Sequence, residues 1–139
     1  MKTLRPFFLV VDIGFIIYWI ITAARVIPGE YLFPDYNNAL LVTWNWSFFP
    51  LDIFISATGL TSIVLFKKDH PLWRPLALVS LVLTFTSGLQ AIAFWAIQGW
   101  FDWSWWLPNL FLMLYPLFFL PRFLRETARL PAQVAQSGT

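Results

Sequence analysis

Basic residues lie on alternate links between four long apolar stretches, and this distribution constrains the fold more than any other feature of the chain. The link at the amino end, the third link and the last link hold eight of the nine Lys and Arg residues: Lys2, Arg5, Lys67, Lys68, Arg74, Arg122, Arg125 and Arg129. The second and fourth links together hold only Arg25. By the positive-inside rule, the pattern predicts a four-span membrane protein with both termini in the cytoplasm.

The composition excludes a soluble domain. Of the 139 residues, 59% are hydrophobic and 12% charged, whereas about a quarter of the residues in a soluble domain are charged. The net charge of +2 comes from basic residues beside apolar stretches, so we attribute it to topology and expect no nucleic-acid partner. The chain has no cysteine, which excludes disulfides and thiolate chemistry.

The apolar stretches predict an all-α, four-helix transmembrane bundle in a single domain, residues 1–130. We expect the spans at about 6–24, 46–66, 75–98 and 107–121, close to the roughly 20 residues that cross a bilayer. Pro50 is expected in the first turn of the second span, where its missing N–H costs little. We expect the first stretch to be retained rather than cleaved as a signal peptide, because Asp12 interrupts its apolar core. Residues 131–139 are predicted to form a mobile polar tail.

Tryptophans gather in the two outer links and at their edges. These are Trp44, Trp46, Trp100, Trp103, Trp105 and Trp106. Amphipathic rings at such positions typically form an interfacial belt that anchors the protein. An aromatic lid over an outward-facing cavity is the alternative interpretation.

Polar residues inside the spans fall at two depths when each residue is given about 1.5 Å of rise. Tyr18, Asp52, Gln90 and Asn109 come to about 18–22 Å from the cytoplasmic ends of their spans. They form either a structural hydrogen-bond network or the lining of a ligand pocket, in which Asp52 would be the counter-ion of a cationic head. Arg25 lies just above and either reaches down toward Asp52 or extends to the headgroups.

Asp12 belongs to a second, inner layer at a depth of about 9 Å. Tyr115, Ser80 and either Thr61 or Ser62 are expected at the same level. The difference of roughly 12 Å in depth excludes a proton shared between Asp12 and Asp52, because coupled carboxylates must lie within a few ångströms of each other.

No motif of nucleophilic, metal or phosphate chemistry occurs in the chain. His70 is the single histidine and lies in a short basic turn without a second ligand nearby, so we expect no metal site and no cofactor. We assign no catalytic residue. Acid-base chemistry by Asp12 or Asp52 is the remaining enzymatic possibility.

Four segments resemble the YvaD-type family of small bacterial membrane proteins: DIGF at 12–15, YLFPDYNN at 31–38, WNWSFFPLD at 44–52 and SGLQAIAFW at 87–95. This resemblance implies a bacterial plasma-membrane protein and no particular substrate. VIPGEYLFP at 26–34 and NALL at 38–41, with an acid in each of the first two spans, are more weakly similar to the emopamil-binding and sigma-2 receptor group. That similarity implies a pocket for amphiphilic ligands.

The leading hypothesis is a non-catalytic bundle that binds a lipid-like or amphiphilic small molecule at the outer polar layer, or that acts as a scaffold. One alternative is an accessory subunit of a larger membrane complex, or a homo-oligomer. The other is an acid-base isomerase or proton-coupled transporter that uses Asp12 and Asp52.

Overall fold

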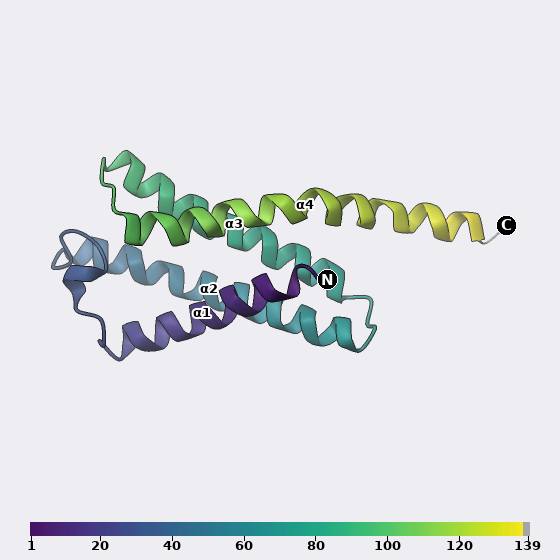
Figure 1. The fold of residues 1–139 in the computed structure, drawn as a ribbon, viewed down its shortest axis with the longest axis horizontal. Helices are drawn as coiled ribbons and strands as arrows, with labels where there is room; N and C mark the ends of the chain where they lie inside the picture. Colours follow the sequence, from purple (N-terminus) through teal and green to yellow (C-terminus); the bar gives the residue numbers. More distant parts are fainter. Residues whose placement is uncertain (138–139) are drawn as a thin grey trace.

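The chain forms four long helices joined by short links (Figure 1). The computed structural model describes the backbone of residues 1–137 and the side chains of residues 1–128. The elements are helix α1 (Arg5–Ala23), the short 3-10 helix η1 (Gly29–Tyr31), and helices α2 (Ala39–Lys67), α3 (Trp73–Ile97) and α4 (Trp103–Ser137). No strand occurs in residues 1–137. The predicted all-α class is therefore confirmed.

All four helices are long and apolar enough to cross a membrane. They pack in sequence order, α1 on α2, α2 on α3 and α3 on α4. We call the end that holds the α2–α3 turn the inner end, and the end that holds the α1–α2 and α3–α4 links the outer end, after the predicted topology. The protein is therefore a multi-pass bundle in which each helix packs against the next one along the chain.

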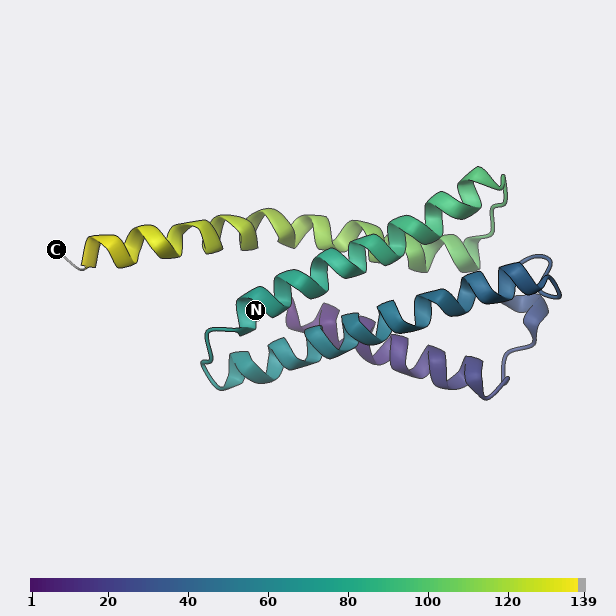
Figure 2. The same ribbon diagram turned by 180° about the vertical axis from the view of Figure 1, so that it is seen from behind.

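α1 and α4 lie close together only near the inner end. Figures 1 and 2 show that the two helices diverge toward the outer end. The contact at the inner end is aromatic, because the Phe7 ring lies 5.3 Å from the Tyr115 ring and 5.2 Å from the Phe119 ring. Leu4, Phe8 and Leu81 are almost completely buried beside this contact. The bundle is thus closed at the inner end and open between α1 and α4 at the outer end.

Two glycines permit close helix contacts. A Cβ atom on Gly59 of α2 would overlap the Asp12 carboxylate of α1. A Cβ atom on Gly88 of α3 would lie 2.7 Å from the backbone oxygen of Asn109 on α4. Small residues in the second and third spans therefore bring α2 against α1, and α3 against α4.

All four helices begin earlier than the predicted spans, and Pro50 is the residue most affected. α2 begins at Ala39 because the Asn38 side chain accepts a hydrogen bond from the Leu40 N–H at 3.0 Å, a typical helix cap. Pro50 consequently lies inside α2 and not in its first turn as predicted. Its missing N–H leaves the Trp46 carbonyl without the usual helical donor. The hydropathy pattern marks the membrane-crossing part, whereas a cap decides where a helix begins.

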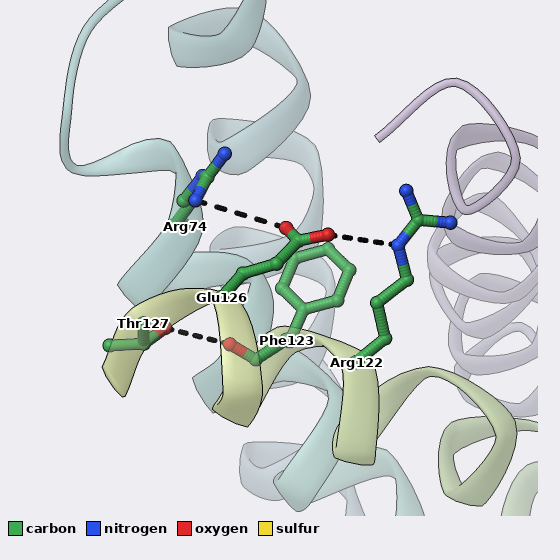
Figure 3. Close-up of polar contacts among 5 residues, drawn as sticks. All are labelled: Arg74, Arg122, Phe123, Glu126 and Thr127. Atoms are coloured by element: carbon green, nitrogen blue, oxygen red, sulfur yellow. Dashed lines mark hydrogen bonds and ion pairs between the residues drawn. The ribbon is translucent and has the colours of Figure 1, made fainter. Parts of the chain in front are cut away.

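An ion-pair cluster joins α3 to α4 at the inner end (Figure 3). Glu126 accepts a 2.9 Å hydrogen bond from Arg122 Nε and lies 3.8 Å from Arg74 Nη1. The Arg74 guanidinium also lies 5.1 Å from the centre of the Trp73 ring. Because these side chains are partly exposed, the pairs fix the helix ends more than they stabilise the bundle.

The predicted mobility of the tail at 131–139 stays a prediction. Residues 131–137 continue α4 as helix beyond the inner end of the other three helices (Figure 1), and residues 138–139 lie outside the described part of the chain.

Candidate functional site

A cavity of about 410 Å³ lies between α1 and α4 in the outer half of the bundle. Ligand pockets typically measure about 300–1,000 Å³. Most of the lining is apolar and comes from all four helices: Val10, Val11, Gly14, Phe15, Trp19, Phe48, Ala91, Trp105, Pro108, Phe111 and Leu112. Four residues add larger polar side chains, namely Tyr18, Asn45, Asp52 and Asn109, and Ser104 adds a hydroxyl. The cavity therefore combines an apolar body with a small polar region.

Asp52 is the acidic residue of this cavity. It is 3% exposed, and two donors hold its carboxylate: Trp19 Nε1 at 2.9 Å from Oδ2 and Ser87 Oγ at 3.1 Å from Oδ1. Within residues 1–128 it forms no ion pair. The carboxylate is thus oriented by α1 and α3 and has no protein cation to balance a negative charge.

The other polar groups lie around Asp52. Asn109 donates from Nδ2 to the Trp105 carbonyl at 2.8 Å. This hydrogen bond does not use the side-chain oxygen of Asn109. Tyr18 lies near Asn45 and Thr22. Three of the four residues predicted for the outer layer, Tyr18, Asp52 and Asn109, therefore line one cavity.

Gln90 does not line this cavity. Its side chain is exposed on the surface of α3, whereas the next residue, Ala91, faces the cavity. Successive residues of a helix are rotated by about 100°. The predicted depth of Gln90 is compatible with the layer, but the rotation of α3 turns the side chain away.

Arg25 lies in a different hollow, of about 710 Å³, formed mainly by the α1–α2 link. It does not pair with Asp52 among the described residues. Asn45 lines both this hollow and the cavity between α1 and α4. Asn45 is therefore a residue shared by the hollow at the α1–α2 link and the cavity that holds Asp52.

The inner polar layer is compact. Asp12 and Ser80 are 0% exposed and Tyr115 is 3% exposed. Of the two alternatives on α2, Ser62 is buried and Thr61 is exposed, so Ser62 is the inner-layer residue.

The two aspartates have separate surroundings. Asp52 is bonded to Trp19 and Ser87, and the Asp12 carboxylate bonds to no side chain that the structure describes. Ser56 Oγ lies 3.0 Å from the Asp12 carbonyl oxygen and 2.9 Å from the Asp52 carbonyl oxygen, so one hydroxyl joins α1 to α2 through the backbone. No cluster of three His, Asp or Glu side chains suitable for a metal occurs in the described part of the chain.

Sequence reasoning missed three residues that shape the cavity: Trp19, Asn45 and Ser87. In the sequence, Trp19 looks like any other aromatic residue of an apolar span. Nothing in such a span indicates which group its indole N–H will contact. Asn45 precedes the predicted span at 46–66, because hydropathy alone does not show that α2 begins at Ala39. The spacing of Ser87 before the small residues Gly88 and Ala91 was the available signal for a polar group on the packed face of α3.

Several aromatic residues of the outer end form a connected cluster beside the cavity. The ring of Trp44 lies 4.0 Å from that of Phe94 and 5.6 Å from that of Trp95, and Trp95 lies 4.6 Å from Trp100. Trp105, a cavity residue, lies 6.3 Å from Trp44. The cluster holds the outer ends of α2, α3 and α4 together.

Comparison with known proteins identifies the family of this chain. Residues 4–130 match the model of a family described as "Family of unknown function (DUF5360)". The chain is 48% identical over 129 residues to the uncharacterized protein YvaD of Bacillus subtilis (strain 168), a match that covers 93% of this chain and 97% of that protein. No solved structure matches. On this evidence the chain belongs to the DUF5360 family, whose function is unknown, and the resemblance to YvaD is confirmed.

Proposed function

We propose that this membrane protein is a non-catalytic bundle that binds a lipid-like or amphiphilic molecule with a cationic head in the cavity between α1 and α4. The observation that carries the proposal is the convergence of Asp52, Tyr18 and Asn109 on one otherwise apolar cavity. The apolar walls suit a hydrocarbon body, and the polar side chains suit a head group.

The open side of the cavity lies between the two helices that diverge. Val10 on α1 and Phe111 on α4 both line the cavity, yet they are 69% and 42% exposed. Side chains exposed at this depth face hydrocarbon in a membrane-spanning bundle. A ligand dissolved in the bilayer would therefore enter sideways, without crossing the water interface.

Asp52 supplies the selectivity in this proposal. An ionised carboxylate inside a membrane is costly unless a cation or donors compensate for it. Trp19 and Ser87 provide two donors, and the cationic head of a bound amphiphile would provide the missing charge. An uncharged amphiphile of the same length would gain only the apolar contacts.

We place the protein in the bacterial plasma membrane with both termini in the cytoplasm. The four long apolar helices support the membrane, and the similarity to a Bacillus protein supports a bacterial one. The basic residues at the inner end support the orientation. The cavity would then open to the outer leaflet.

The experiment measures thermal unfolding of the protein in lipid nanodiscs with dodecylamine or with dodecanol. These probes share a chain and differ in the charge of the head. We expect dodecylamine to raise the unfolding temperature of the wild type more than dodecanol does, because a ligand that binds only the folded state stabilises it. Asp52→Asn should lose this difference.

Asp12→Asn is the matched control, because it replaces the other buried aspartate at a position outside the cavity. It should keep the full difference between the amine and the alcohol. An amine effect of equal size in the wild type and in Asp52→Asn would contradict the proposal.

A further inference from the structure

The Asp12 carboxyl group is sealed inside the inner end of the bundle. It is 0% exposed, and neither of its oxygens has a hydrogen-bond partner among the described residues. The buried Tyr115 hydroxyl likewise has no partner there. Buried polar groups are nearly always paired, so an unpaired carboxyl group requires an explanation.

The hydroxyl groups near Asp12 direct their protons elsewhere. Ser80 Oγ donates to the Ile55 carbonyl at 3.3 Å, and Thr84 Oγ1 donates to the Ser80 carbonyl at 2.7 Å. Ser62 Oγ donates to the Gly59 carbonyl at 2.7 Å. Each hydroxyl has one proton to donate. These side chains can accept a hydrogen bond from Asp12, but they have no proton left to give it.

Within residues 1–128, no cation pairs with Asp12 either. On α1, Arg5 is exposed at the inner end, and Lys67 at the end of α2 and Lys68 just after it are exposed as well. Arg74 of α3 and Arg122 of α4 pair with Glu126. The titratable group that faces Asp12 from the packed helices is Tyr115 of α4, which is neutral in its ordinary state.

These contacts contrast with those of Asp52, which has two donors and an adjoining cavity. An ionised Asp12 would be a buried charge that accepts no hydrogen bond from the described residues and has no counter-ion among them, which is costly. A neutral carboxylic acid avoids this cost, because it carries no charge to compensate.

We propose that the inner polar layer is a proton-binding site, in which Asp12 holds a proton as a neutral acid beside Gly59, within the buried layer that also holds Ser80 and Tyr115. The bound proton allows α1 to pack against α2 at Gly59, where an added Cβ would overlap the carboxyl group. Loss of the proton places a bare charge at this contact and loosens it. The site is independent of the cavity between α1 and α4.

The test is infrared spectroscopy of the protein in nanodiscs, with ¹³C in the side-chain carboxyl groups of aspartate alone. A protonated carboxyl group has a carbonyl stretching band that an ionised one lacks. Asp35, Asp69 and Asp102 are not buried. We expect a labelled band of a protonated acid at neutral pH in the wild type and in Asp52→Asn, and its loss in Asp12→Asn.

A second variant covers poor folding of Asp12→Asn. Asp12→Glu keeps a carboxyl group but carries no label, so the labelled band should again disappear while an unlabelled band appears. A wild-type spectrum without the labelled band, or a band unchanged in both variants, would overturn the proposal.

Thermal stability measured in sodium chloride and in choline chloride decides whether the site binds a proton or a metal cation. Stabilisation by sodium that disappears in Asp12→Asn would assign the site to a metal cation and overturn the proposal.

Discussion

The free energy of a buried carboxyl group depends on its hydrogen-bond partners, and one partner of Asp52 is the indole N–H of an aromatic residue. The Trp19 indole donates to Asp52 at 2.9 Å, and its ring packs 5.2 Å from Trp46 and 5.3 Å from Phe49. Trp19 therefore combines a polar contact with an apolar one. The two contributions can be separated by a replacement that keeps an aromatic ring.

Trp19→Phe should lower the free energy of unfolding by about 1 kcal/mol beyond its packing cost, which is typical of a lost buried hydrogen bond. Chemical denaturation in detergent measures this change. Trp46→Phe is the control, because the Trp46 side chain is partly exposed and has no described contact with Asp52. Equal losses in both variants would mean that the bond to Asp52 contributes nothing to stability.

Gly59→Ala should destabilise the bundle by about 1–3 kcal/mol, as overpacking of a tight contact does. The reason is the overlap between an added Cβ and the Asp12 carboxyl group. Gly14→Ala is the matched control in a neighbouring helix, because nothing lies within 4 Å of an added Cβ there. The cost of Gly59→Ala should fall in an Asp12→Ala background, and a double-mutant cycle without such coupling would contradict the contact.

Residue depth was predictable from sequence, and residue orientation was not. Rise per residue was sufficient to bring Tyr18, Asp52 and Asn109 to one level, and the structure places all three along one cavity. The same reasoning included Gln90, which points outward because the rotation of a helix depends on its neighbours. The partners of Asp52 were beyond prediction, since Trp19 and Ser87 come from helices whose packing order a single sequence does not specify.

At the scale of whole elements, local capping extends the helices beyond the apolar stretches. Asp102 precedes α4, and its Oδ1 accepts from the backbone N–H of Ser104 at 2.9 Å and of Trp105 at 3.3 Å. The Ser104 hydroxyl also donates to it. α4 therefore begins at Trp103, four residues before the predicted span at 107–121.

The bonds to Asp102 also predict how the start of α4 responds to pH. The Ser104 hydroxyl and the backbone donors lower the pKa of Asp102 below its ordinary value of 3.8. A lowered folded-state pKa adds stability above the ordinary value, and that stability is lost as pH falls through the lowered value. Protection of the Ser104 and Trp105 amides from hydrogen exchange, corrected for intrinsic rates, should therefore fall in strong acid.

Asp102→Asn supplies the comparison for this measurement, because asparagine caps helices about as well as aspartate and does not titrate. Its amide protection should stay constant over the same pH range. An acid-induced loss of protection of equal size in this variant would show that another group is responsible.

At the scale of the whole molecule, the sequence correctly predicted four membrane-crossing helices, since long apolar stretches have few alternative folds. It did not predict that α1 and α4 would diverge and leave an open side. That arrangement follows from contacts between helices: Phe7 holds the inner ends together, and Gly88 draws α4 toward α3.

The topology of the whole chain remains a prediction, and reporter fusions test it. A reporter that is active in the cytoplasm should work when it is fused after Thr139, and one that is active outside should work when it is inserted in the link at Asn37 and Asn38. The reason is the concentration of eight of the nine basic residues on the links at the inner end and termini. Reporters on the same side would contradict four spans.

The central claim is that the cavity between α1 and α4 binds a cationic amphiphile, and filling the cavity tests it most directly. Gly14 lines the cavity and has open space beside it, so Gly14→Phe should occupy the ligand's volume without disturbing the fold. Ala57→Phe is the control, because it adds a phenylalanine side chain on the exposed face of α2.

The measurement is the dissociation constant for dodecylamine in nanodiscs, by isothermal titration calorimetry. We expect Gly14→Phe to weaken binding at least about tenfold, equivalent to about 1.4 kcal/mol, and Ala57→Phe to match the wild type; equal affinity in all three proteins would contradict the claim.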